Sequence, residues 1–132
     1  MLFNIKTGYR GIQQRQNDEI VILVTSLPKL IDGKIRFVFT DRHARLATAE
    51  FFDDMEDLPK IDWRILQNRD FSRDNNDLGK MERYQAETLV HRHLPTSSLL
   101  GIACYNALER DRIDTLVRGV VTSPRLVVRL EC

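Results

Sequence analysis

The sequence has little of what marks a secreted or membrane protein. It contains two cysteines, Cys104 and Cys132, and two distant thiols do not form the disulfide framework of a small secreted domain. No apolar run approaches the roughly 18 residues of a membrane span. The opening segment "MLFNIKTGYRG" has no apolar stretch of signal-peptide length. These absences predict a cytoplasmic protein with no membrane association.

The sequence also lacks an excess of charge of either sign. It carries 20 Lys and Arg against 19 Asp and Glu, a net charge of +1. Bulk charge therefore gives no reason to expect a nucleic-acid partner, and any such case must depend on local clusters. A length of 132 residues with 42% hydrophobic residues fits one domain with one modest core. We expect a single domain over residues 1–132.

Runs of β-branched and apolar residues predict the strands. The run "EIVILVTSL" is nearly all apolar and predicts a central strand buried on both faces, ended by Pro28. The other predicted strands are shorter, and the last of them closes the chain. Together they predict one sheet of four or five strands. The five predicted ranges are 19–27, 35–40, 86–91, 99–105 and 124–130.

Helical spacing appears in three places. From Asp41, apolar residues recur every three or four positions up to Met55, which predicts a helix ending in the acidic run 53–57. A short helix over 61–66 has Asp62 as its cap, and a helix over 106–117 begins with Asn106. Helices combined with these strands predict a mixed α/β, or α+β, domain.

The segment 67–84 has no apolar period and is predicted to be a long loop. It alternates basic residues with acids and asparagines, and it holds two aromatic side chains, Phe71 and Tyr84. Cations that contact phosphates and aromatics that stack on bases are typical of single-strand binding. The alternative is an ordinary solvated loop. The four basic residues are Arg69, Arg73, Lys80 and Arg83.

Glu87 is the residue most in need of explanation, because it lies in a predicted strand directly after this loop. A carboxylate in a half-buried strand costs free energy unless it is paired. Strand alternation places Gln85 on the same face. A glutamate held there can stabilise positive charge that develops in a transition state. The alternative is a structural ion pair with Arg83 or Arg92.

Metal chemistry is a weaker interpretation. His91 and His93 form a His-x-His pair predicted to lie on one strand face, a spacing seen in metal sites, with His43 as a distant third candidate. They would serve a metal nuclease. No Cys-x-x-Cys accompanies them, and the acidic run 53–57 is explained more simply as a solvated helix end. The sequence shows no P-loop and no G-x-S-x-G nucleophile motif.

Three motifs together resemble the DarT-type DNA ADP-ribosyltransferase toxins. They are "FTDRHA" from Phe39, "EFFDDMEDLPKIDW" from Glu50 and "RYQAETLVH" from Arg83, in the order and spacing of that family. The resemblance spans nearly the whole chain. It implies an ADP-ribosyltransferase split β-sandwich that transfers ADP-ribose from NAD to a base of single-stranded DNA, usually thymine. It also implies a macrodomain antitoxin as partner and no metal.

The resemblance assigns roles residue by residue. Glu87 is implied to be the catalytic residue, and 67–84 the substrate-recognition loop. Gln85 takes the position that faces the acceptor, and three basic residues of the loop are implied to contact DNA. These residues are Arg73, Lys80 and Arg83.

The chain also departs from the family pattern. Two features of the family have no match in this sequence. One is the first strand, which grips NAD with a His-x-Thr-like motif, and the other is an arginine needed for activity. We therefore expect an N-terminally truncated homologue with an incomplete NAD site, and exposed apolar surface that favours self-association. The alternative function is a non-enzymatic, degenerate relative that binds single-stranded DNA or the antitoxin.

Overall fold

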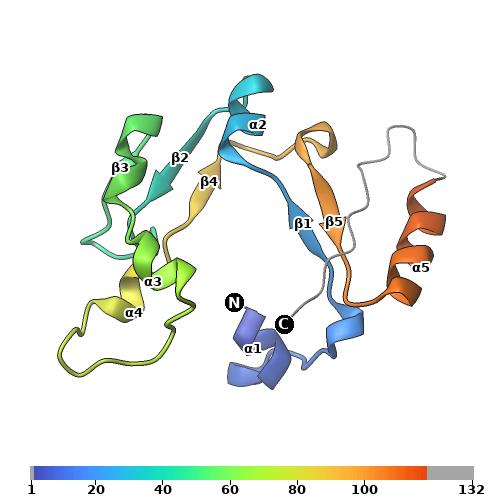
Figure 1. Cartoon of the computed structure of the whole chain (residues 1–132), viewed down its shortest axis with the longest axis horizontal. Coiled ribbons are helices and arrows are strands. Elements are labelled where there is room, and N and C mark those ends of the chain that lie inside the picture. The colour runs from blue at the N-terminus through green and yellow to red at the C-terminus, as the bar shows by residue number, and fades with distance from the viewer. Residues whose placement is uncertain (1, 119–132) are drawn as a thin grey trace. The chain divides into compact units, whose positions relative to one another are not determined.

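The computed structural model describes residues 2–118 of the chain (Figure 1). The predicted strand 124–130 lies outside the described residues. The described residues divide into two compact units, one of residues 2–33 and 95–118, the other of residues 34–94. Each unit holds its own small antiparallel sheet. The prediction of one sheet was therefore wrong for the described strands, which form a pair and a triplet.

The first unit is built around two strands. β1 (Ile22–Val24) pairs antiparallel with β5 (Gly101–Ala103), and Leu23 faces Ile102 in the register. The long helix α5 (Ala107–Val117) begins as the sequence predicted, because Asn106 Oδ1 accepts the backbone N–H of Glu109. The shorter elements are α1 (Leu2–Thr7), η1 (Tyr9–Gly11), η2 (Asn17–Glu19), α2 (Leu27–Asp32) and η4 (Thr96–Ser98).

The expectation that the first strand is buried on both faces was wrong. β1 covers only three residues, all of them exposed, and Leu23 is 59% exposed. The run ends in a helix that the sequence did not reveal. Ser26 Oγ accepts the N–H of Lys29, and Pro28 lies in the first turn of α2, where the lack of an N–H costs nothing.

The second unit contains a three-stranded antiparallel sheet. Its order is β3 (Phe51–Phe52), β2 (Phe37–Thr40) and β4 (Thr88–Val90). Phe39 and Phe52 are buried on it with ring centroids 5.5 Å apart. Ile65 is also buried, on helix α3, which has Asp62 as its cap, as predicted. The remaining elements are η3 (Met55–Lys60), α3 (Trp63–Gln67) and α4 (Lys80–Arg83).

The helix predicted from Asp41 does not form. Residues 41–50 are a loop that leads into β3. Asp41 Oδ1 accepts the N–H of Glu50 at 2.9 Å, which closes the loop on itself instead of starting a helix. The acidic run also has the opposite role to the one expected. Asp54 caps the start of η3, where negative charge agrees with the helix dipole.

Within residues 2–118, no helix is long and apolar enough to cross a bilayer.

Candidate active site around Glu87

The backbone of Glu87 is fixed to the central strand of the three-stranded sheet. Glu87 lies one residue before β4, so it is at the strand's start and not inside it. Its carbonyl accepts the N–H of Thr40 at 2.9 Å, and its own N–H donates to Thr40 Oγ1 at 3.3 Å. Thr40 is completely buried. The sheet therefore determines where the Glu87 side chain begins.

Within the described residues, the contacts of the Glu87 carboxylate fall on one of its two oxygens. Oε1 accepts the backbone N–H of Ala44 at 2.8 Å and lies 2.8 Å from His43 Nδ1. That His43 nitrogen is buried and makes no aligned hydrogen bond within residues 2–118. Within residues 2–118, neither Arg83 nor Arg92 pairs with Glu87. The carboxylate is 35% exposed, so it remains accessible to a ligand.

The loop ahead of Glu87 is tied together by its own charges. Lys80 Nζ lies 2.7 Å from Asp70 Oδ2, and the Lys80 side chain is only 6% exposed. Hydrogen bonds from Lys80 and Ser72 hold the pKa of Asp70 below its ordinary value. Lys80 is therefore occupied within the loop. The structure does not present it as an exposed cation.

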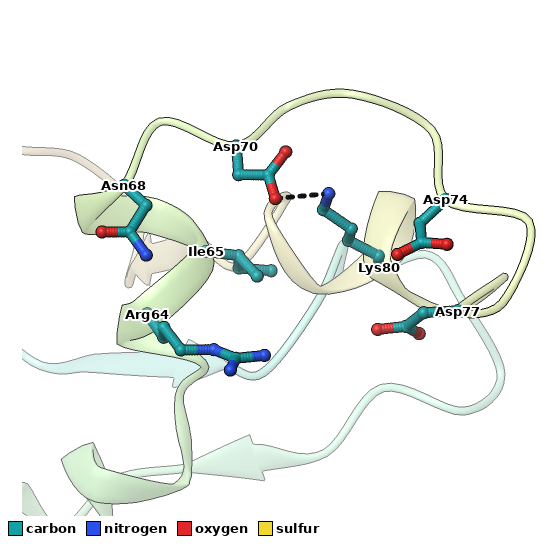
Figure 2. Close-up of a pocket in the computed structure, with 7 residues that line it drawn as sticks. All are labelled: Arg64, Ile65, Asn68, Asp70, Asp74, Asp77 and Lys80. Carbon is teal, nitrogen blue, oxygen red and sulfur yellow. Dashed lines mark ion pairs between the residues drawn. The ribbon is translucent and has the colours of Figure 1, made fainter.

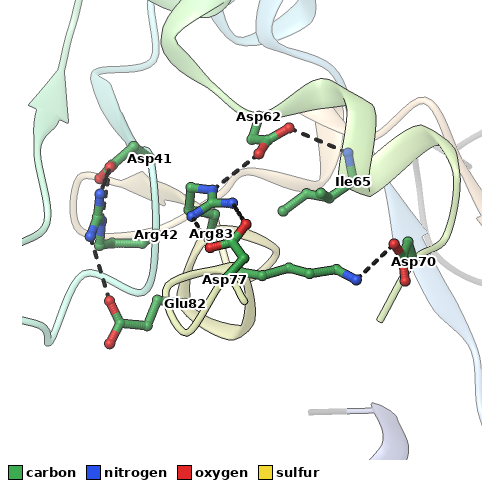
Figure 3. Close-up of polar contacts among 9 residues, drawn as sticks. Asp41, Arg42, Asp62, Ile65, Asp70, Asp77, Glu82 and Arg83 are labelled. Atoms are coloured by element: carbon green, nitrogen blue, oxygen red, sulfur yellow. Dashed lines mark hydrogen bonds and ion pairs between the residues drawn. The ribbon is translucent and has the colours of Figure 1, made fainter. Parts of the chain in front are cut away.

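Arg83 is the most connected cation of this region. It donates to Asp77 at 3.1 Å through Nη1 and to Asp62, the cap of α3, at 3.0 Å through Nε (Figure 3). The hydrogen bond with Asp77 is the main cause of a raised pKa at Arg83, and the hydrogen bond with Asp62 adds to it. Partial burial of the guanidinium opposes this rise but does not cancel it. In turn the Arg83 hydrogen bond lowers the pKa of Asp77. Arg83 thus joins the loop to α3.

A second cluster ties α4 to the loop that carries His43. Arg42 pairs with Asp41 through Nε at 2.8 Å and Nη2 at 2.6 Å. Arg42 Nη1 also lies 3.5 Å from Glu82 Oε2 on α4 (Figure 3). Burial raises the pKa of Asp41, but hydrogen bonds from Arg42 and Glu50 outweigh it and leave that pKa lowered.

A polar cavity of about 290 Å³ lies between α3 and the loop. Figure 2 shows the Asp70–Lys80 ion pair at this cavity. Its wall carries three carboxylates and two cations, so it is not a site for an apolar ligand. The lining residues are Arg64, Ile65, Asn68, Asp70, Asp74, Asp77 and Lys80.

Gln85 and Arg73 are both exposed, but they differ in their contacts. Gln85 lies in a turn after α4, and its Nε2 donates to the carbonyl of Met81 at 2.6 Å. Strand alternation with Glu87 therefore does not apply to it. Arg73 makes no ion pair within the described residues, so it is available to a ligand. Phe71 and Tyr84 stack edge to face with centroids 5.3 Å apart.

The histidine pair does not form the expected face. β4 ends at Val90, and the N–H of His93 donates to the carbonyl of His91 in a bend at 2.9 Å. Both side chains are exposed. Across the described part of the chain, no group of three or more His, Cys, Asp and Glu residues could hold a metal. His43 instead contacts Glu87.

Sequence reasoning missed the partners of Glu87. The Ala44 N–H comes from a position 43 residues earlier, and His43 was considered only as a metal ligand. One available signal was "TDRHA", which places buried Thr40 and Asp41 immediately before His43 and Ala44. A polar cluster directly after a strand often marks a site.

The class of protein is shown by comparison with solved structures. The chain superimposes on Thermus sp. 2.9 DarT in complex with ADP-ribosylated ssDNA with a TM-score of 0.83 and 27% identity, over 97% of this chain and 60% of that one. For the same protein in complex with NAD+, the TM-score is 0.80 at 28% identity, over 97% and 64%. The mixed α+β fold is therefore that of DarT structures.

The family follows from the sequence. The family model described as "ssDNA thymidine ADP-ribosyltransferase, DarT" matches residues 1–131, and the chain belongs to this family. A DNA ADP-ribosyl transferase of Escherichia coli O127:H6 is 49% identical over 114 residues, which are 86% of this chain and 52% of that protein. The chain thus spans about half the length of this relative. The match over residues 1–131 does not support the expected truncation.

Proposed function

We propose that this chain transfers ADP-ribose from NAD to a thymine base in single-stranded DNA, with Glu87 as the catalytic residue. The observation that carries the proposal is the Glu87 carboxylate, which accepts the N–H of Ala44, lies beside His43 and pairs with no guanidinium within residues 2–118. Family membership and the NAD+ complex of a relative support the choice of donor. The printed family description supports the acceptor.

The chemistry matches this arrangement. The bond between ribose C1 and the nicotinamide nitrogen breaks, and its electron pair leaves with nicotinamide. The ribose then carries oxocarbenium-like positive charge, which carboxylates stabilise in glycosidases. With Oε1 of Glu87 held by Ala44, Oε2 is free within the described residues to accept a hydrogen bond from a ribose hydroxyl. A base nitrogen then bonds to C1 and loses its proton to solvent.

Incubation with NAD and a set of single-stranded oligonucleotides tests the proposal. Mass spectrometry is expected to show the mass increment of one ADP-ribose on oligonucleotides that contain thymine, together with released nicotinamide. Matched oligonucleotides without thymine should stay unmodified. DNA binding with no increment on any oligonucleotide would instead indicate a relative that only binds DNA.

Arg73 is proposed to contact a DNA phosphate, because it is the exposed, unpaired cation that the sequence assigned to this role. Arg73→Ala is expected to weaken single-strand binding and to lower the slope of log K against log salt by about 0.7, the value for one phosphate contact. Fluorescence anisotropy at several salt concentrations measures this slope. Arg36→Ala, another exposed arginine of the same unit, is the control, and an equal change in both variants would contradict the proposal.

The partners are proposed on family membership. A macrodomain antitoxin that removes the mark fits a DNA-modifying toxin, and co-expression of such a protein should relieve toxicity.

We also propose self-association through the exposed apolar side chains of β1, where Ile22 is 50% and Leu23 59% exposed. Light scattering of the purified chain would show it as a mass above that of the monomer.

A further inference from the structure

We propose that Lys80 and Arg83 are positioning residues that latch the recognition loop, and that they do not bind DNA phosphates. The inference rests on the proposed function and changes the role of two residues within it. We call the ion pairs Asp70–Lys80, Asp77–Arg83 and Asp62–Arg83 the loop latch.

Burial is the first argument. The Lys80 side chain is 6% exposed, and an ammonium at that depth is stable only when a carboxylate compensates the lost hydration. Asp70 supplies it at 2.7 Å, with Ser72 Oγ at 3.5 Å. A phosphate would have to break this pair and enter a cavity lined by three carboxylates, which repel it.

The separation of the partners is the second argument. Asp70 and Lys80 lie at opposite ends of the segment 70–80, so their pair closes that segment into a ring of chain (Figure 2). Arg83 adds a second tie between the loop and α3 through Asp77 and Asp62 (Figure 3). Neutralising one carboxylate therefore releases the loop, although it makes the region more positive.

Neutralising Asp70 distinguishes experimentally between a Lys80 that contacts phosphate and a Lys80 that holds the loop. If Lys80 contacts phosphate, Asp70→Asn frees a cation and leaves DNA binding equal or tighter. If Lys80 belongs to the latch, the same change loosens the loop and weakens DNA binding. Asp74→Asn is the matched control, because it removes the same charge from the same loop. Within residues 2–118 the Asp74 side chain has no ion pair, and it accepts the N–H of Asn76, which asparagine also does.

Hydrogen exchange measured by mass spectrometry, without NAD or DNA, is the decisive readout. Asp70→Asn and Lys80→Gln are each expected to raise exchange several-fold in peptides from 67–79, with no change in peptides over β2 and β4 and none in Asp74→Asn. The double variant should exchange like either single variant, because one ion pair is lost in all three. Unchanged loop exchange in Asp70→Asn would overturn the latch.

Kinetics then connect the latch to the reaction. We expect Asp70→Asn to raise the KM for the oligonucleotide about tenfold with little change in the KM for NAD, since the latch acts on the acceptor side. Tighter oligonucleotide binding in this variant would show that Lys80 contacts phosphate. Hydrogen exchange is measured on the protein alone. Absence of transferase activity would therefore contradict the proposed function without affecting the exchange result for the loop latch.

Discussion

Glu87→Gln is expected to lower the rate of ADP-ribose transfer to single-stranded DNA by about 10³-fold, the scale at which loss of one preorganised charge-stabilising group acts. Glutamine keeps the shape of the side chain, and its carbonyl oxygen can still accept the N–H of Ala44. Only the negative charge is removed. The melting temperature should therefore stay close to that of the unmodified protein. The lower transfer rate is then due to the reaction step and not to unfolding.

The matched control is Glu56→Gln, which removes the same charge from an exposed glutamate of η3 in the same unit. It should leave the rate of nicotinamide release and the ADP-ribose increment on DNA unchanged. Transfer by Glu87→Gln at the rate of this control would show that the reaction uses another group, and the role given to Glu87 would be withdrawn.

Asp41→Ala is expected to reduce the free energy of unfolding by about 3 kcal/mol, the scale for breaking a buried ion pair from one side. Asp41 is 9% exposed, and it accepts the N–H of Glu50 as well as the Arg42 guanidinium. Its removal leaves three N–H donors, two from Arg42 and one from Glu50, without their acceptor. Urea denaturation followed by circular dichroism measures the change.

The same pair predicts a dependence on pH. Hydrogen bonds from Arg42 and Glu50 outweigh burial and lower the pKa of Asp41 in the folded protein. A lowered carboxyl pKa contributes stability that is complete above the unfolded value of about 4, and that is lost as pH falls through the folded pKa. The difference between the protein and Asp41→Ala should shrink below about pH 4.

An exposed aspartate provides the comparison for both measurements. Asp53→Ala, which precedes η3 and makes no ion pair in the described part of the chain, should change the free energy of unfolding by less than about 0.5 kcal/mol. A loss in Asp41→Ala no larger than this would contradict the importance assigned to the buried pair. If the stability difference between the protein and Asp41→Ala did not depend on pH, the ionised carboxylate of Asp41 would not be its source.

Local signals in the sequence were sufficient where short-range interactions determine the structure. Asp62 and Asn106 were predicted as caps, and each accepts the N–H three residues on. Strands β2 and β4 were predicted from runs of β-branched and apolar residues, and both exist in shorter form. In these cases the deciding contacts lie within a few residues, or the run itself has a strong preference for extended backbone.

Sequence reasoning failed where contacts across longer separations decide. The residues from Asp41 to Met55 have helical spacing, yet the carboxylate of Asp41 binds the N–H of Glu50 and closes a loop instead. Likewise, nothing near Glu87 indicates that its partner is the N–H of Ala44. The loop charges predicted a DNA surface, and charge alone does not show that Lys80 and Arg83 already have carboxylate partners.

The attachment of Glu87 to Thr40 has a consequence for how such proteins diversify. The backbone of Glu87, the proposed catalytic residue, is anchored to the sheet, whereas the preceding segment is held separately by its own ion pairs. In the proposed function, the recognition loop and the reaction centre are therefore held by separate interactions. Substitutions at positions 71–76 and 78–79 are then expected to change the preferred nucleotide context, as long as Asp77 and the other ion-paired residues of the loop latch are kept. An exchange of this segment between relatives would then transplant target preference without rebuilding the chemistry.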